Sequence, residues 1–337
     1  MQTENRKLKI GVLGAGHLGK IHLKQIREIR EYDLIGFYDS DDKQAKLAAK
    51  ETGAKAIRDF DEIVSEAEVI DIVTPTTSHF KYAVEAIEAG KHVFIEKPLT
   101  YTLEEADILV KKVRKSGVKA QVGHVERFNP AFLAAQEEGL EPAFIEATRI
   151  SQYNPRGTDV SVVLDLMIHD LDLVLHLINS EISHVSASGV PVVSDTPDIA
   201  NARIEFENGY VANLTASRAS LKNERKMRIF QKNAYFNINF LEKKLDIIRI
   251  NELKGINLNP LSMTIDPGNG KPKKQVTIHK PKVPEINAIR EELRLFALSI
   301  MENTEPVVTI EDGFRSLRLA YIILEKINEK LNKISFS

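Results

Sequence analysis

The sequence predicts an α/β protein in which a parallel sheet with helices on both faces is followed by an α+β part with a large, mostly antiparallel sheet. Three observations support this prediction. Up to about residue 122, apolar strand-like runs alternate with amphipathic helical patterns, which is typical of βαβ units. After residue 123, strand-like runs mostly follow one another directly. The 337 residues also exceed one typical core, so we expect two domains, 1–122 and 123–337.

The first domain contains strand-like runs with helical patterns between most of them. The runs cover 8–13, 34–38, a short stretch at 54–57, 69–73, 92–96 and 119–122. One intervening helix is expected at 78–89, where Gly90 stops it because glycine readily adopts the left-handed conformation that ends helices. Ligands of such sheets bind beyond the carboxyl ends of the strands, so the residues that follow each strand are the candidate site.

A glycine-rich turn follows the first strand and opens an amphipathic helix that continues to about Arg30. Gly14 permits the tight turn, Gly16 lets the backbone approach a pyrophosphate, and Gly19 lets the helix pack closely on the strand. The free N–H groups at the helix start then face the phosphates. This layout is typical of a Rossmann-type dinucleotide site. The residues expected to bind the cofactor here are Gly14, Gly16, His17, Leu18 and Gly19.

Asp39 ends the second strand-like run, twenty residues past Gly19. Its carboxylate is expected to accept hydrogen bonds from the adenosine ribose, and its charge would repel a 2′-phosphate. The sequence therefore favours NAD over NADP, although Lys43 and Lys46 lie close by in the chain. An ordinary strand-to-helix turn and a site for S-adenosylmethionine are the alternatives, and the rest of the chain argues against the second.

The composition narrows the classes of function. The net charge is −2, so no basic field exists to hold nucleic acid. The chain has no cysteine, which excludes disulfides and cysteine metal sites and fits a reducing compartment. The polar start leaves no room for a signal peptide, and no apolar run reaches membrane-spanning length. We therefore expect a cytoplasmic protein with a small-molecule substrate and neither a nucleic-acid nor a membrane partner.

The second domain is expected to begin with a helix at 130–138, a strand at 143–151 and a long apolar helix at 162–178. Asn208-Gly209 is a hairpin signal between two of the strands that follow. These strands are expected at 184–193, 201–206, 210–217, 227–231, 235–240, 245–250 and 275–279. Residues 253–274 predict a surface loop. Helices at 285–301 and 311–331 close the chain.

Glu96-Lys97-Pro98 ends the fifth strand-like run, where the nicotinamide is expected, so Glu96 and Lys97 are assigned to the cofactor site. Pro98 restrains the backbone of Lys97 to extended angles. A partly desolvated lysine beside a cationic nicotinamide gives up its proton more readily. Lys97 could then exchange a proton with a substrate hydroxyl while hydride leaves the same carbon. The alternative is an exposed lysine at a strand end.

The apolar helix of the second domain carries a polar stripe. At about 100° per residue, Asp165, His169, Asp172 and His176 fall within an arc of about 60°, whereas Asp170 points elsewhere. Because unpaired buried charges are costly, the stripe must face partners or water. We expect Asp165, His169 and Asp172 to bind substrate hydroxyls, with His169 assisting proton transfer. The alternatives are an internal polar network and a metal site, and hydroxyl binding explains these residue types better than a metal.

Further candidates follow other strands. Thr74, Pro75 and His79 are expected to flank the nicotinamide ribose, while Ser78 could equally cap its helix. Arg127 lies in the segment that joins the two domains. It could clamp an anionic substrate group, or it could form an interdomain ion pair with Glu126 or another acid.

Three more cations, Arg156, Arg218 and Lys222, are weaker candidates for contact with a charged substrate, and each is more typical of the protein surface.

These motifs resemble the Gfo/Idh/MocA oxidoreductases, named for glucose-fructose oxidoreductase and inositol dehydrogenase. The glycine turn, Glu96-Lys97-Pro98 and the Asp165/His169 pair occur in the family's order and approximate spacing, and the stretch 292–320 is also similar. The resemblance implies that Lys97 and His169 handle the proton with support from Asp165. It also implies oxidation of a secondary alcohol on a cyclic polyol or sugar, and a homodimer or homotetramer built through the second domain.

The segment 123–131, GHVERFNPA, looks like that of family members acting on UDP-N-acetylhexosamines. The chain departs from the family at 157–161, where GTDVS replaces the usual glycine-rich approach to the Asp165 helix, so the local shape of the cleft is open. A non-enzymatic NAD-bound sensor and a dismutating oxidoreductase with permanently bound cofactor are the competing hypotheses. Retention of Lys97, Asp165 and His169 counts against the sensor.

Overall fold

The computed structural model describes residues 6–154, 160–253 and 263–333. The chain forms two compact units. The first comprises Met1–Phe128 and Asn287–Arg318, and the second comprises Asn129–Ile286 and Leu319–Ser337. This division differs from the expected single boundary after residue 122, because the chain returns to the first unit at Asn287. The reason lies in packing: Leu293 and Phe296 complete the apolar core beside the parallel sheet.

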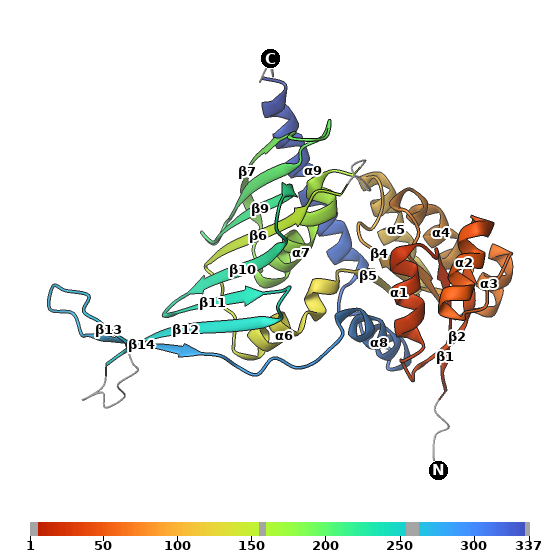
Figure 1. The fold of residues 1–337 in the computed structure, drawn as a ribbon, viewed down its shortest axis with the longest axis horizontal. Coiled ribbons are helices and arrows are strands. Elements are labelled where there is room, and N and C mark those ends of the chain that lie inside the picture. The colour runs from red at the N-terminus through yellow and green to blue at the C-terminus, as the bar shows by residue number, and fades with distance from the viewer. Residues whose placement is uncertain (1–5, 155–159, 254–262, 334–337) are drawn as a thin grey trace, which may run out of the picture. The chain divides into compact units, whose positions relative to one another are not determined.

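The first unit contains a five-stranded sheet in the order β2-β1-β3-β4-β5, and all its strand pairs are parallel (Figure 1). The strands are β1 (Leu8–Leu13), β2 (Tyr32–Tyr38), β3 (Val69–Ile72), β4 (His92–Glu96) and β5 (Ala120–Gly123). Every residue of β3 and β5 is buried. Successive side chains of a strand point to opposite faces, so both faces of the sheet are covered, as the apolar runs predicted.

The strand expected at 54–57 is wrong. Ala56 makes only an isolated bridge to Phe37. Gly53 ends the preceding helix with φ +68° and Asp59 caps the next one, so this segment is a short connection between two helices that touches the edge strand β2 at one bridge. Glu96 therefore ends the fourth strand of the sheet, and Thr74 follows the third.

The helices of the first unit begin and end where their sequences dictate. At α5, Thr102 and Glu105 form a capping box, and Gly117 with φ +73° ends the helix. At α4 the cap is Pro75, so Ser78 lies inside the first turn and is not the cap. The helices are α1 (His17–Ile26), α2 (Asp42–Thr52), α3 (Phe60–Glu66), α4 (Thr76–Glu88), α5 (Leu103–Ser116), a 3₁₀ turn η1 (Val125–Phe128) and α8 (Ala288–Met301).

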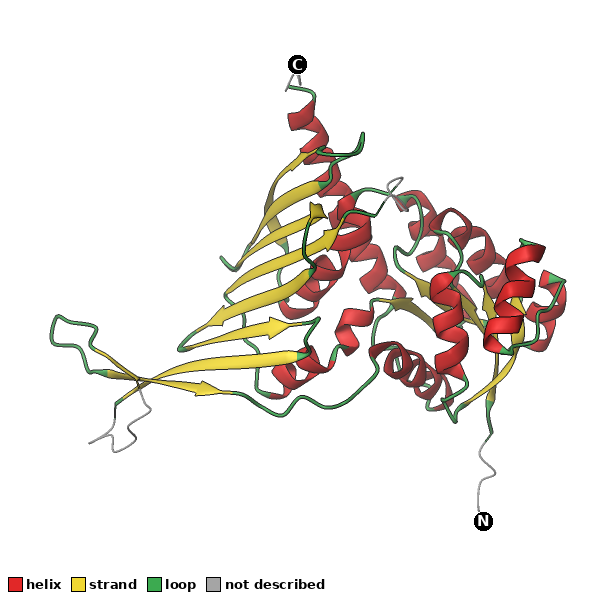
Figure 2. Cartoon of the chain, in the orientation of Figure 1, coloured by secondary structure: helices red, strands yellow, loops and turns green. Residues whose placement is uncertain are grey.

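The second unit contains a nine-stranded sheet in the order β13-β14-β12-β11-β10-β6-β9-β8-β7, whose strands are drawn in yellow in Figure 2 and are mostly labelled in Figure 1. The β6–β9 pair is parallel and the other pairs are antiparallel, which confirms the mostly antiparallel sheet. The strands are β6 (Phe144–Gln152), β7 (Ile182–Val190), β8 (Ile199–Phe206), β9 (Val211–Ser220), β10 (Glu224–Gln231), β11 (Ala234–Asn239), β12 (Lys244–Glu252), β13 (Met263–Ile265) and β14 (Lys274–His279).

Two details of this sheet bear on the sequence predictions. Asn208-Gly209 turns the chain between β8 and β9, as predicted, with Gly209 at φ +82°. The loop expected at 253–274 contains the short strand β13, which pairs with β14. The polar and glycine-rich composition around β13 concealed three residues that extend the sheet edge.

Burial alternates along the central strands of this sheet, for example in β8 and β11. The buried side chains form one apolar core with the helices of the unit. These helical elements are α6 (Pro130–Glu137), a π-helical turn η2 (Val163–Met167), α7 (Ile168–Leu177) and residues 319–331 of α9 (Ile310–Leu331). The side chains that alternate with these buried ones lie on the opposite face of the sheet. On β6 and β10 they include polar residues, among which Arg228 forms an ion pair with Glu146. In the described ranges, no helix combines the length and apolarity needed to cross a membrane.

Candidate functional site

The glycine turn between β1 and α1 has the geometry of a phosphate-binding loop. Gly14 has φ +93°, and a Cβ there would lie 2.7 Å from the Val73 carbonyl oxygen. A Cβ on Gly19 would lie 2.0 Å from the Gly14 oxygen, whereas one on Gly16 would meet no atom within 4 Å. The turn therefore demands glycine at two positions and leaves open space at the third, where a ligand can approach the backbone.

The first turn of α1 leaves its backbone donors available. Gly16 is the N-cap, and no side chain accepts a hydrogen bond there. The unsatisfied N–H groups and the positive end of the helix dipole favour an anion at this end. His17 is exposed at the start of the helix. This arrangement fits the pyrophosphate of a dinucleotide.

The Asp39 carboxylate is fixed beside this turn. Its Oδ2 accepts a hydrogen bond from the Ala15 N–H at 2.7 Å, and its Oδ1 accepts one from the Asp41 N–H at 2.9 Å. Gln44 Nε2 donates to the Ala15 carbonyl at 2.6 Å and closes the link. Each carboxylate oxygen has a second acceptor position, so Asp39 can still accept the hydroxyls of a ribose. Lys43 and Lys46 are exposed on α2.

A small pocket lies at the carboxyl ends of β1, β2 and β3. It is lined by Gly14, Tyr38, Asp39, Ser40, Thr74, Pro75, Ser78 and Tyr82. Tyr38, Ser40 and Tyr82 are not among the site residues predicted from the sequence. Their signals were present, because Tyr38 and Ser40 flank Asp39 and Tyr82 lies one helical turn after Ser78. The buried Oγ1 of Thr74 has no hydrogen-bond partner among the residues that the structure describes, which fits a polar ligand at this edge.

His79 links the loops that follow β3 and β4. Its Nε2 lies 2.8 Å from the Thr74 carbonyl oxygen and its Nδ1 lies 3.0 Å from that of Pro98, and the residue is 1% exposed. Burial lowers the pKa of this imidazole, which keeps the ring neutral with one N–H to donate. This geometry favours a positioning role for His79 over direct contact with a cofactor.

Lys97 follows β4 at the carboxyl edge of the parallel sheet and is partly exposed. Its backbone N–H donates to Glu96 Oε2 at 3.1 Å, and the Lys97–Pro98 peptide bond is cis. Glu96 itself is only 7% exposed, and a Cβ on Gly123 would lie 2.8 Å from its Oε1. The Glu96 side chain thus points into the core, whereas the sequence analysis assigned it to the cofactor.

The polar stripe of the second unit is interrupted. Asp165 lies in the π-helical turn η2, whose wider winding breaks the regular spacing of about 100° per residue. Asp165 and His169 are partly exposed, and Asp172 is 1% exposed. His176 is exposed, with its Nε2 3.0 Å from Gln136 Nε2. The expectation of one buried stripe of four residues is therefore wrong, and Asp165 and His169 remain the accessible pair.

Asp170 points away from this pair, as predicted. Arg149 Nε lies 3.0 Å from Asp170 Oδ2, and Arg149 Nη2 lies 2.9 Å from Asp170 Oδ1. Both residues are 2% exposed. Arg149 is not among the residues predicted from the sequence, although it occupies an inward position after Ile145 and Ala147 on β6. A charge at an inward position of an alternating strand indicates a buried partner.

Two of the cationic candidates, Arg127 and Arg218, form ion pairs with acids of their own unit. Arg127 is 4% exposed, and its Nη2 lies 3.8 Å from Asp312 Oδ1. This contact favours the ion pair over the substrate clamp, with a partner inside the first unit rather than across a domain boundary. Lys222 is exposed. Arg156 lies outside the described residues, as do 157–159 of the segment that departs from the family pattern.

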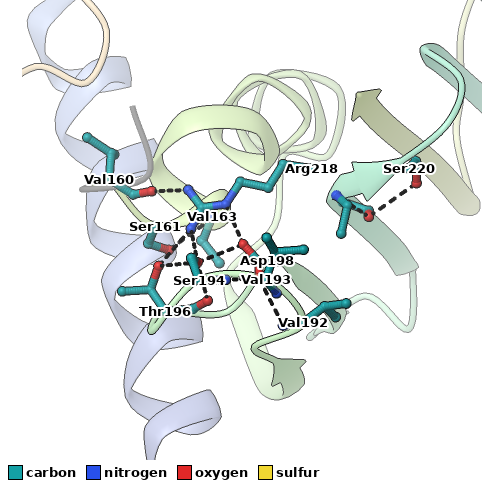
Figure 3. A network of polar contacts seen from close by, with 12 residues as sticks. Val160, Ser161, Val163, Val192, Val193, Ser194, Thr196, Asp198, Arg218 and Ser220 are labelled. Carbon is teal, nitrogen blue, oxygen red and sulfur yellow. Dashed lines mark hydrogen bonds and ion pairs between the residues drawn. The ribbon is translucent and has the colours of Figure 1, made fainter. Parts of the chain in front are cut away.

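Arg218 is the centre of a buried network in the second unit (Figure 3). Its Nε donates to Asp198 Oδ1 at 2.8 Å, and its Nη1 donates to the Val160 carbonyl at 2.5 Å. Its Nη2 donates to Ser194 Oγ at 3.0 Å and Thr196 Oγ1 at 2.7 Å. Arg218 is 5% exposed, so it holds the chain before η2 in place and is not a surface contact for substrate.

Comparison with known families matches both parts of the chain. Residues 8–124 match an oxidoreductase family with an NAD-binding Rossmann fold. Residues 121–236 match the GFO/IDH/MocA C-terminal domain.

Individual relatives are similar over most of the chain. UDP-N-acetylglucosamine 3-dehydrogenase of Acidithiobacillus ferrooxidans is 39% identical over 241 residues, which are 71% of this chain and 76% of the relative. A crystal form of that enzyme superimposes with a TM-score of 0.86 and 33% identity, covering 96% of this chain and 98% of the other. A scyllo-inositol 2-dehydrogenase (NAD(+)) of Bacillus subtilis is 32% identical over 64% of this chain and 68% of its own length.

Proposed function

The chain is an oxidoreductase that belongs to the Gfo/Idh/MocA family, and we propose that it oxidises a secondary hydroxyl of a nucleotide sugar with NAD. The substrate class we propose is a UDP-N-acetylhexosamine, with reaction at carbon 3 of the sugar. The similarity to UDP-N-acetylglucosamine 3-dehydrogenase over nearly the whole fold carries this proposal. The segment 123–131, which resembles that of family members acting on UDP-N-acetylhexosamines, agrees with this substrate class.

We assign the cofactor to the carboxyl edge of the parallel sheet. When bound there, NAD supplies the hydride acceptor. The Gly14–Gly19 turn and the first N–H groups of α1 bind the pyrophosphate, and Asp39 accepts the adenosine ribose hydroxyls. The fixed negative charge of Asp39 disfavours a 2′-phosphate, so NAD is preferred over NADP. Thr74 and Pro75 flank the nicotinamide ribose.

We assign the proton to Lys97. This amine takes the proton of the substrate hydroxyl as hydride leaves the same carbon, and it returns the proton in the reverse reaction. Asp165 and His169 orient and polarise the substrate, since they are the partly exposed members of their polar stripe. Asp172 is buried and supports this helix from inside. Arg127 is left out of the substrate set because its guanidinium faces Asp312.

We also propose a homo-oligomer, a dimer or a tetramer, in the cytoplasm. The face of the second sheet that carries Glu146 and Arg228 is the surface we assign to self-association. Light scattering coupled to size exclusion measures the mass of the particle. A mass of one chain at micromolar concentration contradicts this part of the proposal.

One assay tests the reaction. The protein is incubated with NAD or NADP and with a panel of UDP-sugars, free sugars and inositols, while reduced nicotinamide absorbance is followed. We expect turnover with UDP-N-acetylglucosamine and NAD, and a product lighter by two hydrogens in mass spectrometry. Turnover with inositols alone would overturn the substrate class, and none with any panel member would overturn the proposed function. Native mass spectrometry of the purified protein shows whether the cofactor is permanently bound.

A further inference from the structure

A cluster of ionisable side chains lies in the core of the first unit, and the proposed chemistry uses none of them directly. His22 comes from α1, Asp71 from β3, Glu96 from β4 and Glu292 from α8. Glu96 is 7% exposed and the other three are 0% exposed. His22 Nδ1 lies 2.9 Å from Asp71 Oδ2, and its Nε2 lies 3.3 Å from Glu96 Oε1. Four charged groups in an apolar core are costly unless their charges balance.

Glu292 is the member whose charge is not balanced. Neither of its carboxyl oxygens has a hydrogen-bond partner among the described residues. Candidate polar atoms of His22, Glu96 and Glu292 all lie within 4.8 Å of one another. Two carboxylates this close in a buried site do not both ionise, so one of them keeps a proton.

The surroundings place that proton on Glu292. Burial, and then the charge of Glu96, raise the pKa of Glu292 well above its usual range. Asp71 and Glu126 add to this effect and His22 opposes it, so the acidic neighbours prevail. Burial would by itself lower the pKa of His22, but Asp71 and Glu96 raise it well above its usual value. With a charged His22 between the carboxylates of Asp71 and Glu96, a neutral Glu292 leaves a net charge of −1 in the cluster, whereas an ionised Glu292 would leave −2.

The consequence reaches Lys97 through Glu96. The Oε2 of Glu96 accepts the Lys97 backbone N–H, and its Oε1 faces His22. A neutral Glu292 beside this carboxylate can donate a hydrogen bond to it, whereas an ionised one would repel it. The orientation of the Glu96 carboxylate therefore depends on the protonation of Glu292.

We propose that Glu292 is a positioning residue that stays protonated at neutral pH and holds the Glu96 carboxylate in the orientation that fixes Lys97. The part of this inference that concerns Lys97 rests on the proposed function, in which Lys97 exchanges a proton with the substrate. The protonated state itself is independent of any substrate. The alternative to a proton on Glu292 is a divalent cation bound by His22, Glu96 and Glu292, because imidazole and carboxylate groups are common ligands of such cations.

Infrared spectroscopy tests the protonated state without substrate. The wild-type protein in D2O at neutral pD is expected to show the carbonyl band of a buried carboxylic acid. Glu292→Gln should remove this band, because glutamine resembles the neutral acid in shape but lacks the acid carbonyl. Glu291→Gln is the matched control, since Glu291 is the adjacent α8 residue and pairs with Arg294, and it should keep the band. Absence of the band in the wild type overturns the proposal.

Kinetics and metal analysis complete the test. Glu292→Gln should keep the wild-type kcat at neutral pH and retain activity at alkaline pH, where the wild type loses it. Glu292→Leu, if its circular dichroism is native, should lower kcat on the order of 100-fold, the loss that a misplacement of about 1 Å produces, with unchanged NAD affinity. Identical pH profiles for wild type and Glu292→Gln overturn the proposal. Metal analysis that finds one divalent cation per chain in the wild type and none in Glu292→Gln also overturns the proposal.

Discussion

The network around Arg218 offers the sharpest test of the structural account. Asp198 is 0% exposed, and its Oδ2 accepts the backbone N–H groups of Val192, Val193 and Ser194 at 2.6–2.8 Å. Its Oδ1 accepts Ser194 Oγ at 2.7 Å and Arg218 Nε at 2.8 Å. Arg218→Leu removes the positive partner and leaves the carboxylate buried.

The loss in free energy of unfolding depends on the contacts that Asp198 keeps in Arg218→Leu. Breaking one partner of a buried ion pair typically destabilises a protein by about 3–5 kcal/mol. Asp198 retains its three backbone donors, and leucine adds apolar packing, so we expect about 3 kcal/mol, at the lower end of that range. The Val160 carbonyl also loses its donor, so the segment before η2 should loosen as well.

The assay combines urea unfolding by circular dichroism with hydrogen exchange of the β8 and β9 amides. Arg203→Leu is the matched control, because Arg203 also pairs with a carboxylate, that of Glu205, on the same sheet. Its side chain is 45% exposed, so we expect a loss of at most about 1 kcal/mol. Equal losses for the two variants, or unchanged exchange in β8 and β9 for Arg218→Leu, would refute the reasoning.

The pH dependence gives an independent check. Burial would raise the pKa of Asp198, but the backbone N–H groups of Ser194 and Val193 and then Arg218 lower it well below its usual value. A depressed carboxyl pKa contributes stability that is present above the unfolded value of about 3.9 and is lost as pH falls through the folded value. The wild type should therefore lose stability below about pH 4 more steeply than Arg218→Leu.

Three further changes test other parts of the account. Gly19→Ala would place a Cβ 2.0 Å from the Gly14 oxygen, so calorimetry should show NAD affinity at least about tenfold weaker; wild-type affinity would remove the packing argument. Asp39→Ser loses a charged acceptor worth about 1.5–3 kcal/mol, so NADH fluorescence titration should show weaker NAD binding and a higher NADP-to-NAD affinity ratio; an unchanged ratio contradicts the ribose assignment. The pKa of Glu292 is raised in the folded protein, so the wild type should lose urea stability as pH rises from the unfolded value of about 4.3 toward the folded value, by up to about 1.4 kcal/mol per pH unit more than Glu292→Gln. Parallel slopes would count against the protonated state.

Local sequence was sufficient for most elements of the fold. The strand expected at 8–13 coincides with β1, and that at 92–96 coincides with β4, because apolar runs bounded by turns determine both. The π-helical turn η2 was not predictable, since its sequence is as apolar as a regular helix and only tertiary packing selects the wider turn. The strand β13 is three exposed residues whose pairing with β14 has no local signature.

Some residues of the candidate site were likewise predictable from local sequence, whereas others depend on partners far away in the chain. The glycine turn and Asp39 are recognisable because their spacing is set within one βαβ unit. The partners of Asp170 and Asp198 lie about twenty residues away on neighbouring strands, so no helical or strand period connects them. Glu292 is farther still from His22 and Glu96, and its role depends on the return of the chain to the first unit at Asn287.

The most direct test of the central claim follows the hydride itself. UDP-N-acetylglucosamine carrying deuterium at carbon 3 of the sugar is incubated with the protein and NAD, and the reduced cofactor is examined by mass spectrometry. We expect the deuterium to appear on the nicotinamide ring with the wild type, whereas Lys97→Met should bind NAD but transfer none. Unlabelled reduced cofactor, or normal transfer by Lys97→Met, would contradict this expectation.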